Sequence, residues 1–351
     1  KPVSPYLTWE KTRQYDLGLD MDMFNYRLNV KLDYYYKYTS SLIYDIPIPG
    51  SLYAFGAQVE NAMEISNEGL ELELQADILR ESAVSWRMKF NMARNWNRFE
   101  KSYSGKDVVD GDGTLLVVGR PLNGLYVWAH RGYYNSDAEV PRLYKIDGQE
   151  IYFNGVATNG ISGAVGDYRL LDLDGDGNPD SYYAGSPLPL AHGGWVNELM
   201  WKNFDLNVLV NFTIGRKMIN NRMGLGFSRQ SEDGHLTKLF DYRKLRPWDG
   251  VNKKPNAPAW GNSLSMNTDS AIEKVHHLAL KQITLGYNLP DRISKKAGLS
   301  GVRFFLTAEN LFYLSNYSGG NPEVVNIYTG RDNGDTYPLP RKYTLGLTLN
   351  F

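Results

Sequence analysis

The sequence is 351 residues long, enough for one large domain or two ordinary ones, and its 38 basic and 39 acidic residues give a formal net charge of −1. A near-neutral chain without a basic run does not favour nucleic acid as a partner. The absence of cysteine excludes a disulfide scaffold and a thiolate metal site. No apolar run reaches the roughly 18 residues of a transmembrane helix, but a barrel strand needs only about 9–11 residues of alternating character.

Alternation of apolar and polar residues dominates the chain, while helical periodicity is nearly absent. In the segment 28–37, for example, apolar or aromatic residues at even positions alternate with residues such as Asn29, Lys31 and Asp33. An all-β fold is therefore expected, in which each strand has one wet and one dry face. Strands are predicted over 14–23, 28–37, 70–78, 84–92, 204–212, 302–309 and 342–351, with less regular ones at about 192–201 and 276–288.

The links between these strands alternate between short and long. Short links are expected at 23–25, 80–83, 202–203 and 289–301, and long ones at 44–66, 100–190, 217–273 and 315–340. Outer-membrane barrels have short periplasmic turns and long extracellular loops, whereas structureless links this long are unusual in a compact soluble domain. The pattern predicts a transmembrane antiparallel β-barrel with long extracellular loops.

The direction of the last strand fixes the sides of the membrane. If residues 343–351 run down to the periplasm, about nine strands place every short link on one side and every long link on the other. Residues 100–190 then form one extracellular excursion, which includes the strand-like stretch 124–134. An odd number of strands leaves an open edge, so we expect the partner strands to lie outside this sequence. The first residues, 1–4, carry no signal peptide, which indicates a fragment or processed piece.

Several segments, in chain order and over almost the whole sequence, resemble the SusC/RagA type of TonB-dependent outer-membrane transporter. The most specific is YPLPRKYTLGL at 337–347. The others are LTWEKT at 7–12, DYYYK at 33–37, NEGLEL at 67–72, WKNFDL at 201–206, LKQITLGYNLP at 280–290, AENLF at 308–312 and the pair Pro322-Glu323.

This resemblance implies that residues 1–351 are the C-terminal portion of a barrel of the 22-stranded, plugged type, in the outer membrane of a Gram-negative, Bacteroidetes-like bacterium. It implies active import of a large nutrient, such as an oligosaccharide or a peptide. TonB would act through a plug, which like the N-terminal domain does not appear in this sequence, and a SusD-type surface lipoprotein would cap the outer side. The remaining barrel strands and outer-membrane lipid would be further partners.

Other classes of function stay open on the residues alone. A passive porin or a siderophore-type receptor would occupy the same membrane. A surface structural or adhesin barrel is a different class, and a soluble glycan-binding sandwich would show the same alternation with its dry face turned inward. The plug and TonB-binding segment, or co-purification of a lipoprotein lid, would distinguish the transporter from these.

The sharpest local motif, DLDGDGNPD at 172–180, matches the D-x-D-x-D-G pattern of calcium-binding loops. Tyr183 stands where such loops carry a bidentate Glu, so a further ligand or waters would have to complete the shell. A structural Ca²⁺ that stiffens the long loop is expected, because close carboxylates repel one another without a cation. The alternative is a turn-rich loop held by Asx hydrogen bonds. The expected ligands are the carboxylates of Asp172, Asp174, Asp176 and Asp180 and the backbone carbonyl of Asn178.

No enzyme motif occurs: the chain lacks a nucleophile elbow, a P-loop, a zinc-protease motif and a dinucleotide fingerprint. Paired carboxylates such as Glu71 and Glu73 are interpreted as part of a solvated lumen wall. His276 and His277 point to opposite faces of one strand and cannot share a metal, and the other histidines are isolated. We expect the protein not to be an enzyme.

Three further sets of aromatic and apolar residues are candidates for ligand or lid contact, for the membrane interface and for barrel assembly. Aromatic residues of the long excursion could stack on sugar rings or pack against a lid, or simply hold the loop together; they are Tyr126, Trp128, Tyr133, Tyr134, Tyr152, Tyr182 and Tyr183. Strand-end aromatics are expected in interfacial girdles, namely Trp86, Trp96, Trp195, Trp201, Tyr343 and Phe351. The last strand resembles the signal read by the outer-membrane insertion machinery, through Tyr343, Leu345, Leu347, Leu349 and Phe351.

Overall fold

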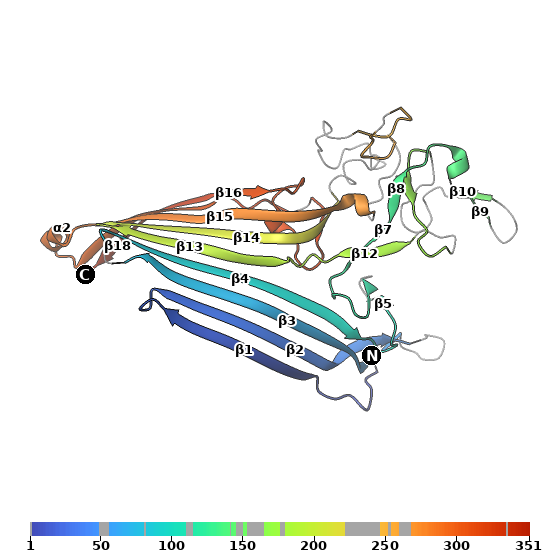
Figure 1. Cartoon of the computed structure of the whole chain (residues 1–351), viewed down its shortest axis with the longest axis horizontal. Helices are drawn as coiled ribbons and strands as arrows, with labels where there is room; N and C mark the ends of the chain where they lie inside the picture. The colour runs from blue at the N-terminus through green and yellow to red at the C-terminus, as the bar shows by residue number, and fades with distance from the viewer. Residues whose placement is uncertain are drawn as a thin grey trace.

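A computed structural model describes residues 2–48, 56–80, 82–109, 115–140, 142–144, 150–152, 165–175, 180–221, 246–251, 254–259, 268–334 and 336–351. Its main feature is a ten-stranded sheet with the order β1-β2-β3-β4-β13-β14-β15-β16-β18, in which the short β17 pairs in parallel with β14 (Figure 1). The long strands are β1 (Lys11–Met23), β2 (Leu28–Pro47), β3 (Ala57–Leu79), β4 (Val84–Lys101), β13 (Ala191–Trp201), β14 (Phe204–Asn220), β15 (Ile272–Asn288), β16 (Gly301–Ser315) and β18 (Lys342–Asn350), and β17 is Arg331–Asp332.

Every predicted strand coincides with one of these long strands, except that Phe351 lies one residue beyond the end of β18, and all neighbours along the path are antiparallel. The prediction of an all-β antiparallel fold is therefore confirmed. Several strands are longer than expected. The predicted long link 44–66 is wrong in extent, because β2 and β3 keep pairing up to Pro47 and Ala57. Residues there pack on a small core around Met63 and Phe99 instead of alternating between water and a dry face.

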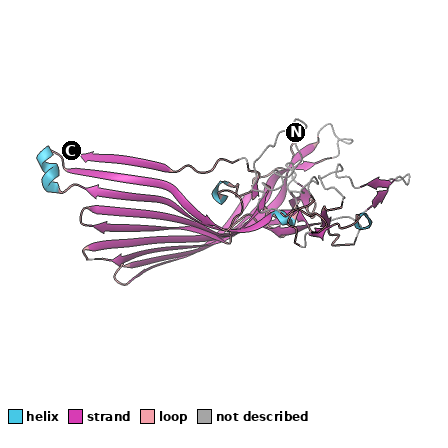
Figure 2. Ribbon diagram, turned by 90° about the horizontal axis from the view of Figure 1, so that it is seen from above, coloured by secondary structure: helices cyan, strands magenta, loops and turns pink. Residues whose placement is uncertain are grey.

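Short links gather at one end of the sheet, which Figure 2 shows at the end that also carries the last residue. The link after β1 turns through three consecutive residues with left-handed backbone, Phe24, Asn25 and Tyr26, and Lys202 has the same conformation in the link after β13. The fourth link, 289–300, contains the short helices α2 (Asp291–Ser294) and η4 (Lys295–Ala297). The predicted alternation of short and long links is confirmed except after β2, where the link 48–56 is shorter than the link 289–300 at the opposite end.

The long links gather at the opposite end. The link between β4 and β13 forms small two-stranded sheets apart from the large one. The strand-like stretch 124–134 supplies β7 (Leu125–Trp128) and β8 (His130–Tyr133), which pair with β12 (Ser181–Gly185) and β11 (Tyr168–Leu170). The remaining short elements are β5 (Val108–Val109), β6 (Leu115–Leu116), β9 (Arg142–Tyr144), β10 (Glu150–Tyr152), η1 (Asp137–Glu139), η3 (Asp269–Ala271) and η5 (Pro322–Val324). Among the residues described, no helix is long and apolar enough to cross a membrane.

The two faces of the large sheet differ in chemistry, as the registers show. Leu206, Leu285, Leu306 and Leu345 lie side by side in one row across β14, β15, β16 and β18, and Leu345 is 82% exposed. We call this side the apolar face. On the opposite side, the polar face, one row runs Lys31, Glu73, Asn91, Gly194 and Asn211 across β2, β3, β4, β13 and β14.

Candidate functional site

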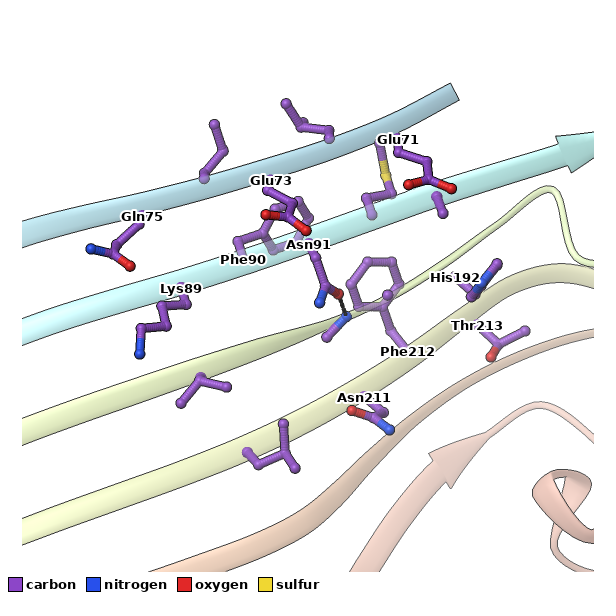
Figure 3. Close-up of a pocket in the computed structure, with 18 of the residues that line it drawn as sticks. Glu71, Glu73, Gln75, Lys89, Phe90, Asn91, His192, Asn211, Phe212 and Thr213 are labelled. Atoms are coloured by element: carbon purple, nitrogen blue, oxygen red, sulfur yellow. Dashed lines mark hydrogen bonds between the residues drawn. The ribbon is translucent and has the colours of Figure 1, made fainter. Parts of the chain in front are cut away.

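A cavity of about 840 Å³ lies against the polar face (Figure 3). Strands β2, β3, β4, β13 and β14 supply most of its lining, and His277 of β15 and Glu323 of η5 complete it. The expected solvated, polar character of Glu71 and Glu73 agrees with this position. The other polar lining residues are Asn29, Lys31, Gln75, Lys89, Asn91, His192, Asn211 and Thr213.

Two adjacent glycines of β13 shape the floor of the cavity. The backbone N–H of Gly194 donates a 2.6 Å hydrogen bond to the Asn91 carboxamide, drawn in Figure 3. Beside it, Gly193 leaves no room for a side chain, since a Cβ there would meet the carbonyl oxygen of Asn91 at 2.0 Å. On the opposite, apolar face of the sheet, the rings of Phe90 and Phe212 stack next to Gly193 with centroids 5.7 Å apart. The wall therefore presents hydrogen-bonding groups to the cavity from a rigidly packed sheet.

The loop after β16 folds back onto the polar face through Glu323. Its carboxylate lies 3.2 Å from the Lys281 ammonium and 3.3 Å from His277 Nε2. His277 Nε2 is buried and has no hydrogen-bond partner of good geometry among the described residues, so it approaches the carboxylate without forming a directed bond. The neighbouring His277 and then Lys281 lower the pKa of Glu323, against the opposing effect of its burial. Lys281 reaches the loop because a β-bulge in β15 occurs at this residue.

Arg216 of β14 fixes the same loop from a second position. Its guanidinium is buried and donates to four backbone carbonyls, those of Pro187, Pro322, Val325 and Asn326. These acceptors belong to two separate links, so one side chain joins the strand to both. Nothing in the sequence singles out Arg216 or the role of Glu323, apart from the pair Pro322-Glu323 in the family resemblance.

The aromatic residues of the long excursion lie mostly against one another. Tyr126 and Tyr183 have ring centroids 5.6 Å apart, and the Arg120 guanidinium lies 4.9 Å from the Tyr183 ring. Burial raises the pKa of Tyr126 to about 12, and its hydroxyl has no hydrogen-bond partner among the described residues. The two rings therefore pack on each other, and Tyr183 also lines a cavity of about 490 Å³.

A second aromatic cluster surrounds Tyr168, which stacks on Tyr133 at 5.4 Å and meets the edge of His130 at 4.6 Å. His130 Nδ1 contacts the Asp269 carboxylate, which also accepts a 3.1 Å hydrogen bond from the Tyr182 hydroxyl. The interpretation of His130 as isolated is therefore wrong, because the fold brings a carboxylate from 139 residues away.

These contacts favour the loop-holding alternative for Tyr133 and Tyr182, and Tyr134 is likewise buried. Trp128 is half-buried, and the side chain of Tyr152 lies outside the described part of the chain. A role of these aromatics in ligand or lid contact stays a prediction.

The acidic loop is described only in part. Asp172, Asp174 and Asp180 bring carboxylate oxygens within 4.8 Å of one another. Asp180 accepts hydrogen bonds from the backbone of Leu173 and Asp174, and Asp172 accepts one of 2.6 Å from Gly175. The other two expected ligands, Asp176 and Asn178, lie outside the described residues. The geometry suits both the calcium hypothesis and the Asx-turn alternative.

The last strand presents its apolar side chains on an open surface. Tyr343, Leu347 and Leu349 are 65%, 54% and 42% exposed, and Phe351 is 92% exposed. Of the expected girdle tryptophans, Trp96, Trp195 and Trp201 are exposed, while Trp86 donates a 3.1 Å hydrogen bond to Asn197. The assembly signal stays a prediction.

Comparisons with known proteins agree with the resemblance seen in the sequence. The family described as "TonB dependent receptor-like, beta-barrel" matches residues 2–183. TonB-dependent receptor P26 of Formosa agariphila is 30% identical over 100% of this chain and 36% of its own length. TonB-dependent receptor SusC of Bacteroides thetaiotaomicron is 26% identical over 100% of this chain and 33% of its own. The chain thus spans about a third of the curated relatives it matches.

The structure of the RagAB peptide transporter matches 99% of this chain and 36% of its own, with a TM-score of 0.73 and 24% identity. At that identity the match shows the fold alone. The predicted resemblance to the SusC/RagA type is confirmed by the curated relatives, which are named TonB-dependent receptors and include SusC, and the RagAB match agrees in fold.

Proposed function

Because the chain belongs to the TonB-dependent receptor-like β-barrel family, we propose that it forms barrel wall and loops of an outer-membrane importer for a large nutrient, an oligosaccharide or a peptide. The observation that carries this proposal is the family match over residues 2–183 together with the similarity to SusC along the whole chain. RagAB is a peptide transporter, which supports a peptide as one of the two substrate classes.

The lengths of the links between strands indicate which end of the sheet faces the periplasm. The end with the short turns faces the periplasm and the end with the long links faces outward, as in other outer-membrane barrels. Residues 100–190 then form one extracellular excursion of the single barrel portion 1–351. The apolar face meets lipid, and the polar face with its cavity lines the lumen.

The proposed partners supply the energy for import and the cover of the outer end, which the barrel wall does not provide. TonB delivers energy through a plug that occupies the lumen, and a SusD-type lipoprotein covers the outer end. The anchored loop around Glu323 and the tyrosine clusters of the excursion give the outer end defined surfaces on which such a lid could close.

Uptake by cells that carry the full-length receptor tests this function. Cells are given labelled oligosaccharides and peptides, with and without a functional TonB. Uptake of one class that disappears without TonB, together with a co-purifying lipoprotein, supports the proposal. Uptake that persists without TonB indicates a porin, uptake of iron chelates without a lid indicates a siderophore-type receptor, and unchanged uptake on deletion of the receptor favours a structural or adhesin barrel.

We also propose that the loop 172–180 binds a structural Ca²⁺ in the complete receptor. The convergence of Asp172, Asp174 and Asp180 supports this. Calorimetric titration of the full-length receptor with Ca²⁺ should lose its signal in Asp174→Asn but not in Asp137→Asn, which removes a charge from η1 of the same excursion. Equal binding by both variants would contradict the proposal.

A further inference from the structure

The wall has a lateral gap near its outer end. Strand β13 begins at Ala191, and its pairing with β4 starts at His192 opposite Ala93, although β4 continues to Lys101. Figure 1 shows β4 and β13 diverging toward the end that carries the long links. Residues 183–190 enter this gap and leave a cavity of about 490 Å³ between β4 and β14.

Three cationic side chains line this cavity, those of Arg94, Lys217 and Lys274, and no carboxylate is among the described residues that line it. Lys217 and Lys274 lie directly opposite each other on β14 and β15. Like charges in this position destabilise a strand pair, so their presence calls for a compensating anion.

The nearby carboxylates are engaged elsewhere. Glu273 accepts hydrogen bonds from Asn220 and Ser318, and Glu68 accepts one from Tyr34. Within the described ranges, none of the three cations forms an ion pair; the Lys217 ammonium donates to the carbonyl of Ala184.

The register places these cations on the apolar face. Met92, Gly193, Phe212 and Leu278 form one row of that face across four strands. Because side chains alternate along a strand, Arg94 stands on the same side as Met92, two residues away, and Lys274 on the same side as Leu278, four residues away. Lys217 shares the side of its partner Lys274.

The cations therefore lie at the outer margin of the surface that meets lipid. Trp96 also lines the cavity and is 36% exposed, and the Arg94 guanidinium lies 4.4 Å from its ring centroid. Tryptophan concentrates at the interface between hydrocarbon and headgroups, and Arg and Lys near that level attract anionic lipids.

We propose that Arg94, Lys217 and Lys274 bind the negatively charged phosphate headgroup of an outer-leaflet lipid. The phosphate would lie in the lateral cavity, where it separates the two opposed lysines. The Arg94 guanidinium would donate to phosphate oxygens in the paired geometry that this group favours. This inference rests on the proposed location in the outer membrane and is independent of the proposed import of a substrate.

Lipid retention by the full-length receptor tests this inference. The receptor is placed in nanodiscs of phosphatidylcholine with a minority of phosphatidic acid, released, and its bound lipids are counted by native mass spectrometry. We expect selective retention of phosphatidic acid, weakened about tenfold or more in the double variant Arg94→Gln/Lys274→Gln. The matched control Lys31→Gln/Lys37→Gln removes the same charge from the polar face and should retain the lipid.

Several outcomes would overturn the inference. They are equal retention of phosphatidylcholine, an equal loss in the control, or no loss in the double variant. Displacement of the lipid by inorganic phosphate at the same concentration would identify a soluble anion as the occupant instead. If the double variant does not fold, the charge-preserving variant Arg94→Lys/Lys274→Arg tests the proposal in its place. This variant should retain phosphatidic acid, and loss of the lipid despite a native melting curve would contradict the proposal.

Discussion

The guanidinium of Arg216 on β14 donates a 2.9 Å hydrogen bond to the backbone carbonyl of Val325, 109 residues later in the chain. The same group donates to three further carbonyls, so within the described part of the chain a buried positive charge is compensated by carbonyl groups and not by a carboxylate. A buried charge is tolerated only when it is fully hydrogen-bonded, which makes this contact selective for arginine. Arg216 thereby fixes the loop after β16 against the polar face.

Replacing Arg216 with methionine should release that loop. The four carbonyls lose their donor, and we expect the free energy of unfolding to fall by about 2–4 kcal/mol. Folding of the full-length receptor in bilayers, followed with denaturant, measures the loss, and limited proteolysis should cut the loop faster. Lys342→Met removes an exposed cation 3.7 Å from Glu309 and should change stability by less than about 1 kcal/mol. Equal losses in the two variants would contradict the anchoring role.

The contact of Glu323 with His277 and Lys281 should depend on pH. Because the pKa of Glu323 lies below its ordinary value of 4.5 in the folded protein, its ionised form stabilises the closed loop. That stabilisation is fully present above pH 4.5 and is lost as the pH falls through the lower, folded-state pKa. The protection factors of residues 316–334, which correct for the slower intrinsic hydrogen exchange in acid, should therefore fall on acidification below pH 4.5.

The variant Glu323→Gln separates this contact from general acid effects. It keeps the shape of the side chain but removes its charge, so the protection factors in the loop should already be low at neutral pH and should change little on acidification. An acid response in Glu323→Gln as large as in the wild type would show that another group controls the loop.

The strands and the contacts of Arg216 and Glu323 differ in how far the sequence predicts them. The alternation of apolar and polar residues predicts every long strand, because successive side chains of a strand point to opposite faces of the sheet. It was least regular at 276–288, where the bulge at Lys281 moves the strand from one phase to the other. The contact of Arg216 with Val325 could not be predicted, since nothing local to either residue specifies a partner so distant in sequence. Loop tyrosines such as Tyr133 were recognised as a group, but only the fold shows that they face one another.

The orientation of the sheet can be tested on β18. Leu347→Arg places a charge on the apolar face and should cost about 2–4 kcal/mol near the middle of the bilayer. Thr344→Arg, on the polar face opposite Thr307, should cost much less. Thr348 lies on the same polar face, but it is a poorer control because it stands opposite Arg303, where an added cation would meet a like charge. Equal costs in a bilayer folding assay would show that the faces are assigned wrongly.

Deletion of Phe351 separates assembly from stability. Phe351 is 92% exposed, and its only hydrogen bond within the described part of the chain is the one its carbonyl accepts from the Ser300 hydroxyl at 3.2 Å. The free energy of unfolding of the full-length receptor should therefore fall by no more than about 1 kcal/mol. If the last strand is read by the insertion machinery, the amount of receptor in the outer membrane of cells should fall far more than this loss explains, and Phe351→Tyr should restore it. A decrease in cells no larger than the loss of stability predicts would mean that the aromatic end has no part in assembly.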